Sequence, residues 1–258
     1  MGGLRDMFSL KGRVAVVTGA GRGIGRGVAL AFAEAGADVS VCARTTADVE
    51  KVAGEVRQQG RRGLAVTCDV RKVDQVEEMV RRTVAELGRV DILVNNAGGQ
   101  FWSKLLDMSE RGFNTIIQEN LTSVFIVSNA VVKTMVEQGH GGSLINLSTG
   151  GALYGGAGTA PYAAAKAGVI NLTMTQSQEW ARHNIRVNCI LPGAIWTEGV
   201  AAVLFNTPER KEKGLSHIVR GRFGTPEDIA LACIYLASEA SDWVTGQHFY
   251  ITGGDKWF

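Results

Sequence analysis

Short apolar runs alternate along the chain with longer amphipathic segments. The apolar runs fall at residues 14–17, 39–43, 64–67, 90–94, 144–147, 185–191 and 249–251, and helical spacing covers residues 26–35, 48–59, 73–87, 121–137 and 162–182. Continuous apolar strands separated by helices are typical of a parallel sheet covered by helices on both faces. Because crossovers between parallel strands are right-handed, we expect an α/β fold with a doubly wound sheet.

One break in this alternation follows the sixth apolar run. About thirty residues separate Pro192 from the next helix start, Thr225-Pro226-Glu227, which has a Thr N-cap and Pro at the first helical position. A segment this long, placed after the carboxyl end of a strand, is typical of a binding loop, although an ordinary surface excursion is the alternative. No repeat or linker divides the chain, so we expect one domain, 1–258, with a substrate loop at about 193–222.

Composition and charge exclude several classes of protein. The 258 residues carry 27 basic and 25 acidic side chains with no basic patch, so we expect no nucleic-acid partner. No apolar run approaches the roughly 20 residues that span a bilayer, and no signal core is visible, which favours a cytoplasmic protein without a membrane partner. The four histidines are isolated from one another, and no metal site is expected. The cysteines, which stand far apart and are expected to be reduced, are Cys42, Cys68, Cys189 and Cys233.

The first apolar run leads directly into a glycine-rich loop and then a helix. Such a loop lets the backbone turn tightly and approach a pyrophosphate, which then lies on the helix N-terminal amides. The spacing is G-x-x-x-G-x-G, so the more familiar G-x-G-x-x-G fingerprint is not matched literally. The loop reads Thr18-Gly19-Ala20-Gly21-Arg22-Gly23-Ile24-Gly25.

The end of the second apolar run bears on the choice of cofactor. An acid there would bind the adenosine ribose hydroxyls and repel a 2′-phosphate, but the run ends in Arg44, and the first acid after it is Asp48. Arg22 adds a second guanidinium, and arginine binds phosphate bidentately. We therefore expect NADP(H), the alternative being that Arg44 is only a solvated side chain.

Tyr162 and Lys166 are four residues apart at the start of a predicted helix and therefore share one face. A tyrosine that acts as a base near neutral pH needs its pKa lowered by about three units, or ~4 kcal/mol. A neighbouring ammonium group and an oxidised nicotinamide would both lower it. Taken alone, however, this spacing is common on amphipathic helices.

Further motifs accompany the pair. They are Asn95-Asn96-Ala97-Gly98, Ser148-Thr149 and Pro192-Gly193, which follow the fourth, fifth and sixth apolar runs. With the glycine loop, they make residues 11–254 resemble the short-chain dehydrogenase/reductase family, in its compact branch that includes 3-oxoacyl-[acyl-carrier-protein] reductases and hydroxysteroid dehydrogenases. The resemblance implies a Rossmann fold with a seven-stranded parallel sheet and a homotetramer built through the helices beginning near Asn120 and Tyr162 and the C-terminal strand.

The resemblance also implies roles for individual residues. Tyr162 would be the general acid/base, Lys166 would hold the ribose hydroxyls and lower the tyrosine pKa, and Asn120 would kink its helix and anchor a proton-relay water. Asp69 and Val70 would contact adenine. The expected cofactor-binding positions are Thr18, Gly19, Gly21, Arg22, Gly23, Ile24, Gly25, Arg44, Asp69, Val70, Asn96, Ala97, Gly98, Tyr162, Lys166, Pro192, Gly193, Ile195 and Thr197.

One position departs from the family pattern. The family usually has a serine thirteen residues before the tyrosine, and this chain has Thr149 there, with Ser148 beside it. A threonine hydroxyl donates the same hydrogen bond, although its methyl group restricts the rotamer. Counting from the strand and from the tyrosine favours Thr149, and a local loop shift would let Ser148 serve instead.

Aromatic and apolar residues near the motifs suggest an apolar substrate, a ketone or an acyl thioester. They are Phe101, Trp102, Tyr154, Trp196, Val203, Leu204 and Phe205, with Gln100 beside them. We expect a 3-oxoacyl-type ketone reductase. The alternatives are a hydroxysteroid dehydrogenase, an enoyl- or dienoyl-thioester reductase, and a non-catalytic dinucleotide-binding sensor. The aromatic tail, Trp257-Phe258, is predicted to bury against another subunit or cap a neighbouring cleft.

Overall fold

The computed structural model describes residues 3–4 and 6–254, and within them the chain forms a seven-stranded, all-parallel sheet. The strand order is β3-β2-β1-β4-β5-β6-β7, which confirms the predicted doubly wound α/β fold. The strands are β1 (Val14–Thr18), β2 (Asp38–Ala43), β3 (Gly63–Thr67), β4 (Ile92–Asn95), β5 (Gly142–Leu147), β6 (Ile185–Pro192) and β7 (His248–Ile251). The prediction for the aromatic tail falls outside the described residues.

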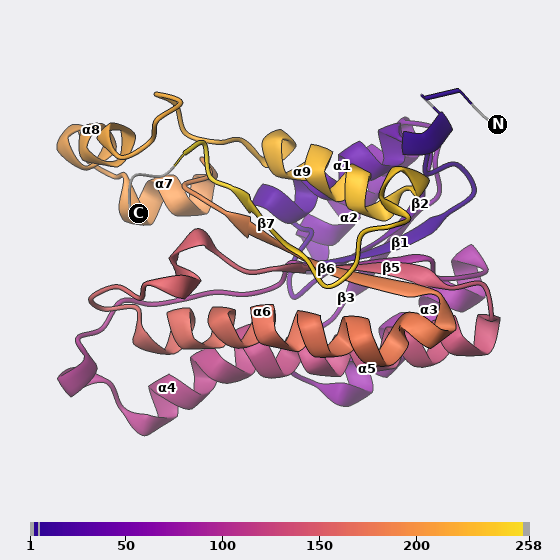
Figure 1. Ribbon diagram of the computed structural model, residues 1–258, viewed down its shortest axis with the longest axis horizontal. Helices are drawn as coiled ribbons and strands as arrows, with labels where there is room; N and C mark the ends of the chain where they lie inside the picture. The colour runs from indigo at the N-terminus through magenta and orange to yellow at the C-terminus, as the bar shows by residue number, and fades with distance from the viewer. Residues whose placement is uncertain (1–2, 5, 255–258) are drawn as a thin grey trace.

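Helices cover both faces of this sheet (Figure 1). On one face, α1 (Gly23–Glu34), α2 (Thr46–Gln58) and α9 (Pro226–Ala237) bury side chains such as Phe32 and Ile229 against the strands. On the other face lie α3 (Val73–Leu87), α5 (Ser123–Gln138) and α6 (Ala160–Trp180), with Met79 and Met135 among their buried side chains. The two apolar layers explain why the strands read as continuous apolar runs.

The direction of strand addition reverses between β1 and β4. At such a switch point the loops leaving two adjacent strands turn to opposite faces, and a crevice opens beyond the carboxyl ends of the strands. The glycine loop follows β1, and the Asn96-Ala97-Gly98 segment follows β4. The fold therefore brings these two motifs together at the place where ligands bind in sheets of this kind.

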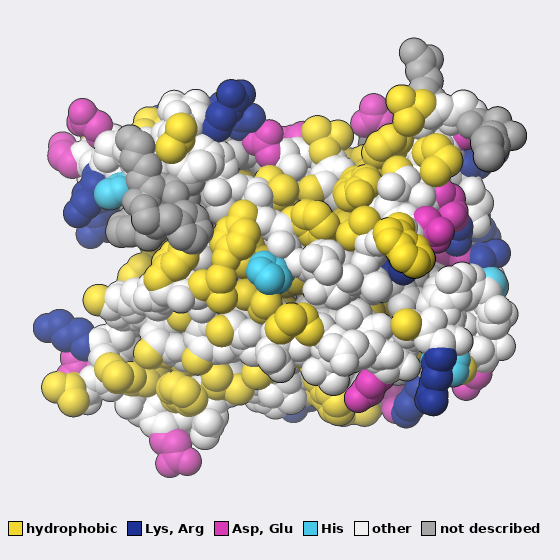
Figure 2. Space-filling model, viewed as in Figure 1, with side chains coloured by type: hydrophobic (Ala, Val, Ile, Leu, Met, Phe, Trp, Pro, Cys, Tyr) yellow, Lys and Arg dark blue, Asp and Glu magenta, His cyan; other side chains and the backbone are white. Residues whose placement is uncertain are grey.

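The segment between β6 and α9 contains two short helices, α7 (Glu198–Leu204) and α8 (Pro208–Ser216). Its two ends are tied together, because the Trp196 amide donates to the Gly224 carbonyl at 2.7 Å and the Gly224 amide donates to the Ala194 carbonyl at 3.0 Å. Helix α9 begins at Pro226, with Thr225 as its N-cap, as predicted. Figure 2 shows the surface hollowed between the lobe that carries α7 and α8 and the lobe that carries α4 (Glu110–Ile117).

Helix α5 continues a longer helical run than the sequence predicted. The run Glu110–Gln138 comprises α4, a π-turn η3 (Gln118–Thr122) and α5. Its length, and the mean hydropathy of 1.2 in its most apolar 18-residue window, would suffice to cross a membrane, whereas no apolar run of that length was expected. Val127, Val131 and Met135 of this run are packed in the core against the sheet. The apolar composition is therefore that of a helix in the core of an α/β fold.

Candidate active site

Hydrogen bonds fasten the loop after β1 to the loop after β4. The Thr18 hydroxyl accepts from the amides of Asn96 and Ala97, both at 3.1 Å, and donates to the Val94 carbonyl. The Asn96 side chain donates to the carbonyls of Thr18 at 2.9 Å and Gly19 at 3.1 Å. These bonds hold the floor of the crevice in one arrangement.

The glycine loop is shaped by positive backbone angles and close packing. Gly19 and Gly23 have φ values of +64° and +56°, a region that side chains disfavour. A Cβ at Gly25 would lie 2.4 Å from the Gly19 carbonyl oxygen, so the first turn of α1 can approach the loop only without a side chain there. Arg22, the N-cap of α1, makes no side-chain capping bond in the described structure. The amides of the first helical turn are thus available to an anion.

One end of the crevice is a pocket of about 200 Å³ that combines several predicted cofactor positions. It is lined by Gly19, Gly21, Arg22, Ala43, Arg44, Thr45, Asp48, Cys68, Asp69, Val70, Ala97, Gly98 and Glu119. The Asp69 carboxylate accepts from the Arg71 side chain, which lowers the Asp69 pKa. The Arg44 guanidinium lies 3.4 Å from the Glu119 carboxylate.

Asn120 is fully buried in the π-turn. Its amide group donates to the Gly99 carbonyl at 2.7 Å and to the Ile116 carbonyl at 3.0 Å, and its oxygen accepts from the Gly99 amide at 3.2 Å. The extra residue of a π-turn displaces the helix locally, as the predicted kink requires. Asn120 thereby holds the segment after β4 at Gly99, as Thr18 holds it at Asn96 and Ala97.

Tyr162 and Lys166 lie on the first turns of α6, with the lysine Nζ 5.8 Å from the centre of the tyrosine ring. Burial raises the pKa of Tyr162 to about 12, opposed by a hydrogen bond with Thr149. Burial also lowers the pKa of Lys166 to about 8, and its Nζ donates to the Leu147 carbonyl at 2.8 Å. Burial thus dominates the Tyr162 pKa, and the lowering of this pKa by Lys166 stays a prediction. Tyr162 is therefore a protonated phenol near neutral pH.

The two neighbouring hydroxyls after β5 point to different partners. The Ser148 hydroxyl is buried and donates to the Lys166 carbonyl at 2.8 Å, so it is used within the fold. The Thr149 side chain hydrogen-bonds Tyr162. Both residues reach the crevice, but the Thr149 hydroxyl is the one placed at the tyrosine.

Tyr162 opens into a cavity of about 420 Å³ that is continuous with the glycine loop. Its lining includes the motif residues Asn120, Ser148, Thr149, Tyr162, Lys166, Pro192, Gly193, Ile195 and Thr197. Apolar side chains complete the wall, namely Ile24, Leu147, Ala194, Val200, Leu204 and Phe205. Thr197 caps α7 by accepting from the Val200 amide and lies against Gly23.

Most of the aromatic residues predicted around this cavity lie elsewhere. Phe101, Trp102 and Tyr154 are exposed, and Trp196 packs on Phe205, with ring centres 6.0 Å apart. None of these four described side chains lines the cavity, whereas Phe205, on which Trp196 packs, does. The side chain of Val203 falls outside the described residues.

Sequence reasoning missed several contributors to the crevice, among them Glu119, Leu147 and Val200. Glu119 directly precedes the predicted Asn120, and this neighbourhood is the signal that could have found it. Leu147 and Val200 carry no such signal, because an apolar side chain in a cavity wall has the same pattern as one in the core.

The described residues contain no group of three or more His, Cys, Asp or Glu side chains arranged to hold a metal ion. The four cysteines are free and buried.

The chain matches known proteins over nearly its whole length. Residues 19–255 match the family model described as enoyl-(acyl carrier protein) reductase. A 2-dehydro-3-deoxy-D-gluconate 5-dehydrogenase from Escherichia coli is 40% identical, with 96% of each chain covered. A 3-oxoacyl-[acyl-carrier-protein] reductase from Thermotoga maritima is 39% identical, over 95% of this chain and 98% of the relative.

Solved structures of similar sequence also share the fold of this chain. A 7α-hydroxysteroid dehydrogenase complexed with NADH and 7-oxo glycochenodeoxycholic acid superposes with a TM-score of 0.93 at 35% identity, covering 99% of this chain and 98% of that one. An Agrobacterium tumefaciens protein described as a 2-deoxy-D-gluconate 3-dehydrogenase, with bound NADP, gives a TM-score of 0.89 at 34% identity, covering 96% and 98%. The chain therefore belongs to the short-chain dehydrogenase/reductase family and is an NAD(P)-dependent oxidoreductase acting on CH–OH groups and the corresponding carbonyls.

Proposed function

We propose that this protein reduces a ketone on an apolar substrate with NADP(H), and that the preferred substrate is of the 3-oxoacyl type. The observation that carries the proposal is the protonated Tyr162 phenol beside the Thr149 side chain in a cavity with apolar walls. A phenol whose pKa is about 12 keeps its proton until a carbonyl oxygen gains negative charge. Tyr162 then donates that proton, and the Thr149 hydroxyl orients the carbonyl by a second hydrogen bond.

Lys166 and Asn120 act around this pair. The Lys166 Nζ, bonded to the Leu147 carbonyl, is placed to bind ribose hydroxyls and to carry positive charge toward Tyr162 as the phenolate forms. Asn120 holds the Gly99 backbone in place through two hydrogen bonds, and this positions the part of the cavity wall that follows β4. Ser148, whose hydroxyl is used by the Lys166 carbonyl, is a positioning residue for α6.

The residues of the crevice fit a nicotinamide dinucleotide. The uncapped first turn of α1 suits a pyrophosphate, and Arg22 and Arg44 at the far pocket suit a 2′-phosphate, which supports NADP(H). Asp69, Val70 and Asn96 line the same groove and suit the adenosine, while Ile195 and Thr197 suit the carboxamide. When bound, the reduced nicotinamide supplies the hydride.

The wall of the cavity supports an apolar substrate. Leu147, Val200, Leu204 and Phe205 offer no hydrogen-bond partner to a polyhydroxylated acid, such as the one named for the Escherichia coli relative. Three of these four side chains are on or beside α7, so we propose that the segment 193–222 is the substrate loop of a single catalytic domain, 1–258.

Other substrates compete with the 3-oxoacyl type. A hydroxysteroid would fit an apolar cavity, and the bile-acid enzyme shares the fold closely. An enoyl thioester is suggested by the name of the family model, but there the hydride adds to the β-carbon and the product is a saturated thioester, so no alcohol oxygen has to receive the Tyr162 proton. A non-catalytic dinucleotide sensor would have no use for that pair.

The test is oxidation of NADPH and NADH, followed by absorbance, on a panel of carbonyl compounds. The panel contains 3-oxoacyl thioesters, enoyl thioesters, steroid ketones and a keto sugar acid, each with the wild type and Tyr162→Phe. We expect turnover of a 3-oxoacyl thioester that is lost in Tyr162→Phe. Enoyl turnover that survives in the variant, or preference for the keto acid, would refute the proposed substrate. Binding of NADPH without any turnover would favour the sensor.

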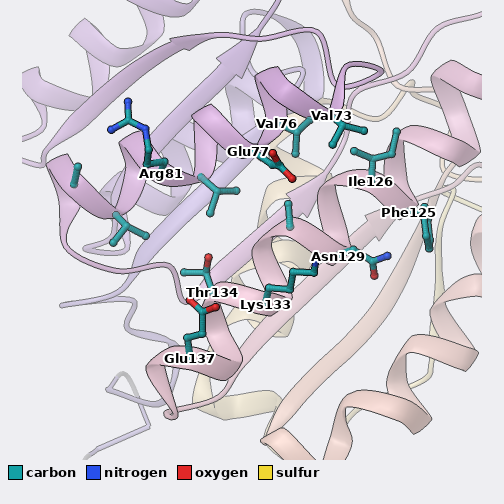
Figure 3. A pocket seen from close by; sticks show the side chains of 14 residues that line it. Val73, Val76, Glu77, Arg81, Phe125, Ile126, Asn129, Lys133, Thr134 and Glu137 are labelled. Atoms are coloured by element: carbon teal, nitrogen blue, oxygen red, sulfur yellow. The ribbon is translucent and has the colours of Figure 1, made fainter.

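We also propose that the protein is a cytoplasmic homotetramer, built from two surfaces. One is the face of α5 and α6, where Phe125 and Met174 are exposed and a groove of about 640 Å³ runs between α3 and α5 (Figure 3). Glu77 and Lys133 are among the charged residues along it, and a two-fold axis running between them would place each charge near the opposite charge of the other copy.

The second surface lies over α9 and the edge strand β7, where hydrophobic side chains gather in Figure 2. Leu231 and Trp243 are exposed there by 67% and 98%. We expect light scattering to give a tetramer for the wild type. Phe125→Glu should give a dimer, and a monomeric wild type would contradict the proposal.

A further inference from the structure

A carboxylate faces the arginine that is proposed to bind the ribose phosphate. Glu119, in η3, and Arg44, which follows β2, line the same pocket of about 200 Å³. The Arg44 Nη2 and the Glu119 Oε1 are 3.4 Å apart. The Arg44 guanidinium therefore already has an ion-pair partner within the protein.

The two members of this ion pair are held to different degrees. The Glu119 side chain is 17% exposed, whereas the Arg44 side chain is 61% exposed. The carboxylate lies against the segment after β4, since a Cβ at Gly99 would be 3.4 Å from both of its oxygens. Glu119 is thus the fixed member of the pair, and Arg44 is the member that can turn toward another anion.

Two other acids, Asp48 and Asp69, line the pocket, but Glu119 is the one that forms an ion pair with Arg44 among the described residues. Asp69 accepts hydrogen bonds from the Arg71 Nε and Nη2, the latter at 2.6 Å. Arg22 also lines the pocket and is exposed, but no ion pair with it is present among the described residues. The Arg44 charge also helps to lower the pKa of Asp69, but its ion pair is with Glu119, so an anion that enters the pocket competes with Glu119 for this guanidinium.

We propose that Glu119 is a specificity-determining residue that sets the preference between NADPH and NADH. A ribose 2′-phosphate must draw Arg44 away from Glu119 and tolerate the negative charge that remains beside it. A ribose with a free 2′-hydroxyl meets neither obstacle, and the Arg44–Glu119 pair stays closed. Arg44 attracts the 2′-phosphate and favours NADPH, whereas Glu119 lowers the affinity for NADPH relative to NADH. The inference rests on the proposed dinucleotide site.

The test measures dissociation constants for NADPH and NADH by quenching of tryptophan fluorescence or by calorimetry, without substrate. The proteins are the wild type, Glu119→Gln, Arg44→Ala, the double variant, and Glu50→Gln as control, since Glu50 pairs with Arg57 on the exposed face of α2. Because partly exposed ion pairs are weak, we expect Glu119→Gln to bind NADPH roughly three- to tenfold more tightly. Its affinity for NADH should change less than about twofold, and the control should match the wild type.

The double variant separates the possible causes. In the Arg44→Ala background the effect of Glu119→Gln on NADPH should shrink, because no guanidinium is left to release. Unchanged NADPH affinity in Glu119→Gln, or an equal gain with and without Arg44, would overturn the inference and leave the dinucleotide site standing. Binding of neither dinucleotide by the wild type would overturn both. NADPH affinity that is insensitive to Arg44→Ala would refute the proposed phosphate contact and, with it, the inference.

Discussion

Replacing Lys166 by Met should stabilise the protein at neutral pH while abolishing its activity. The lysine is 3% exposed, and burial lowers its pKa from 10.5 to about 8. A shift of this size means that burying the charged form costs ~3 kcal/mol. Methionine keeps most of the volume and loses the Nζ bond to the Leu147 carbonyl, which is worth ~1 kcal/mol. We therefore expect a net gain of ~2 kcal/mol at pH 7, or a rise in Tm of roughly 4–8 °C.

The pH dependence identifies the cause. Below pH 8 the lysine is charged in both the native and unfolded states, so the native state bears the full cost of burial. Between pH 8 and pH 10.5 the native state loses its proton first, the wild type gains stability as pH rises, and the advantage of Lys166→Met shrinks. Near pH 10.5 the advantage should be gone or reversed.

The assay is denaturant unfolding at pH 7, 9 and 10.5 at one protein concentration, with Lys51→Met as an exposed-lysine control. Other groups that titrate in this range are shared by all three proteins and cancel in the difference. A variant less stable than the wild type at pH 7, or a difference that does not change with pH, would show that the buried ammonium is not the source.

Three further predictions concern the site and its supports. Thr149→Val should lower kcat by roughly 10²–10³-fold, because it removes a hydrogen bond to the reacting carbonyl. Ser148→Ala should instead cost about 1 kcal/mol of stability and change kcat only a few-fold. Steady-state kinetics and denaturant unfolding measure both effects, and the opposite pattern would mean that Ser148 is the hydroxyl at the substrate. Gly25→Ala places a Cβ 2.4 Å from the Gly19 carbonyl oxygen and should lower the free energy of unfolding by ~2 kcal/mol or more. Gly54→Ala lies in open space within α2 and should raise the free energy of unfolding by ~0.5–1 kcal/mol in the same assay. The Arg222 side chain lowers the pKa of Asp228 to about 2. Asp228→Asn should therefore cost about 1 kcal/mol of stability above pH 4, and this difference should disappear as the pH falls through about 2. If the stability of both proteins fell in parallel during acid titration, the prediction would be wrong.

The hydrophobic pattern was sufficient to predict every strand of the sheet. The predicted runs 14–17 and 185–191 correspond to β1 and β6 within one residue at each end. The run 90–94 was placed too early, because Val90 is buried in the turn before β4 and not in the strand. Helix α1 begins at Gly23, before the predicted residue 26, because a helix entered from a glycine loop without a side-chain cap has no polar start signal.

The sequence also predicted which residues would gather in the crevice, since the carboxyl ends of parallel strands meet at one edge of the sheet. Tyr162, Thr149 and Asn120 are found together there, as expected. Counting along the sequence favoured Thr149 over the adjacent Ser148 but left Ser148 open as the alternative. Successive side chains on extended backbone point to opposite sides, so a shift of one residue exchanges their partners, and only the packing of α6 against β5 fixes that register.

Thus the sequence by itself determined the fold class, the order of the motifs and the chemistry available to the site. Periodicity records which face of an element is buried, and this is a local property of the chain. The tertiary structure alone decided the contacts between distant segments. It turned Trp196 onto Phe205, paired Arg44 with Glu119 and raised the pKa of Tyr162. Each of these depends on distances of a few ångströms between loops, and those distances are set by how whole layers of helices pack on the sheet.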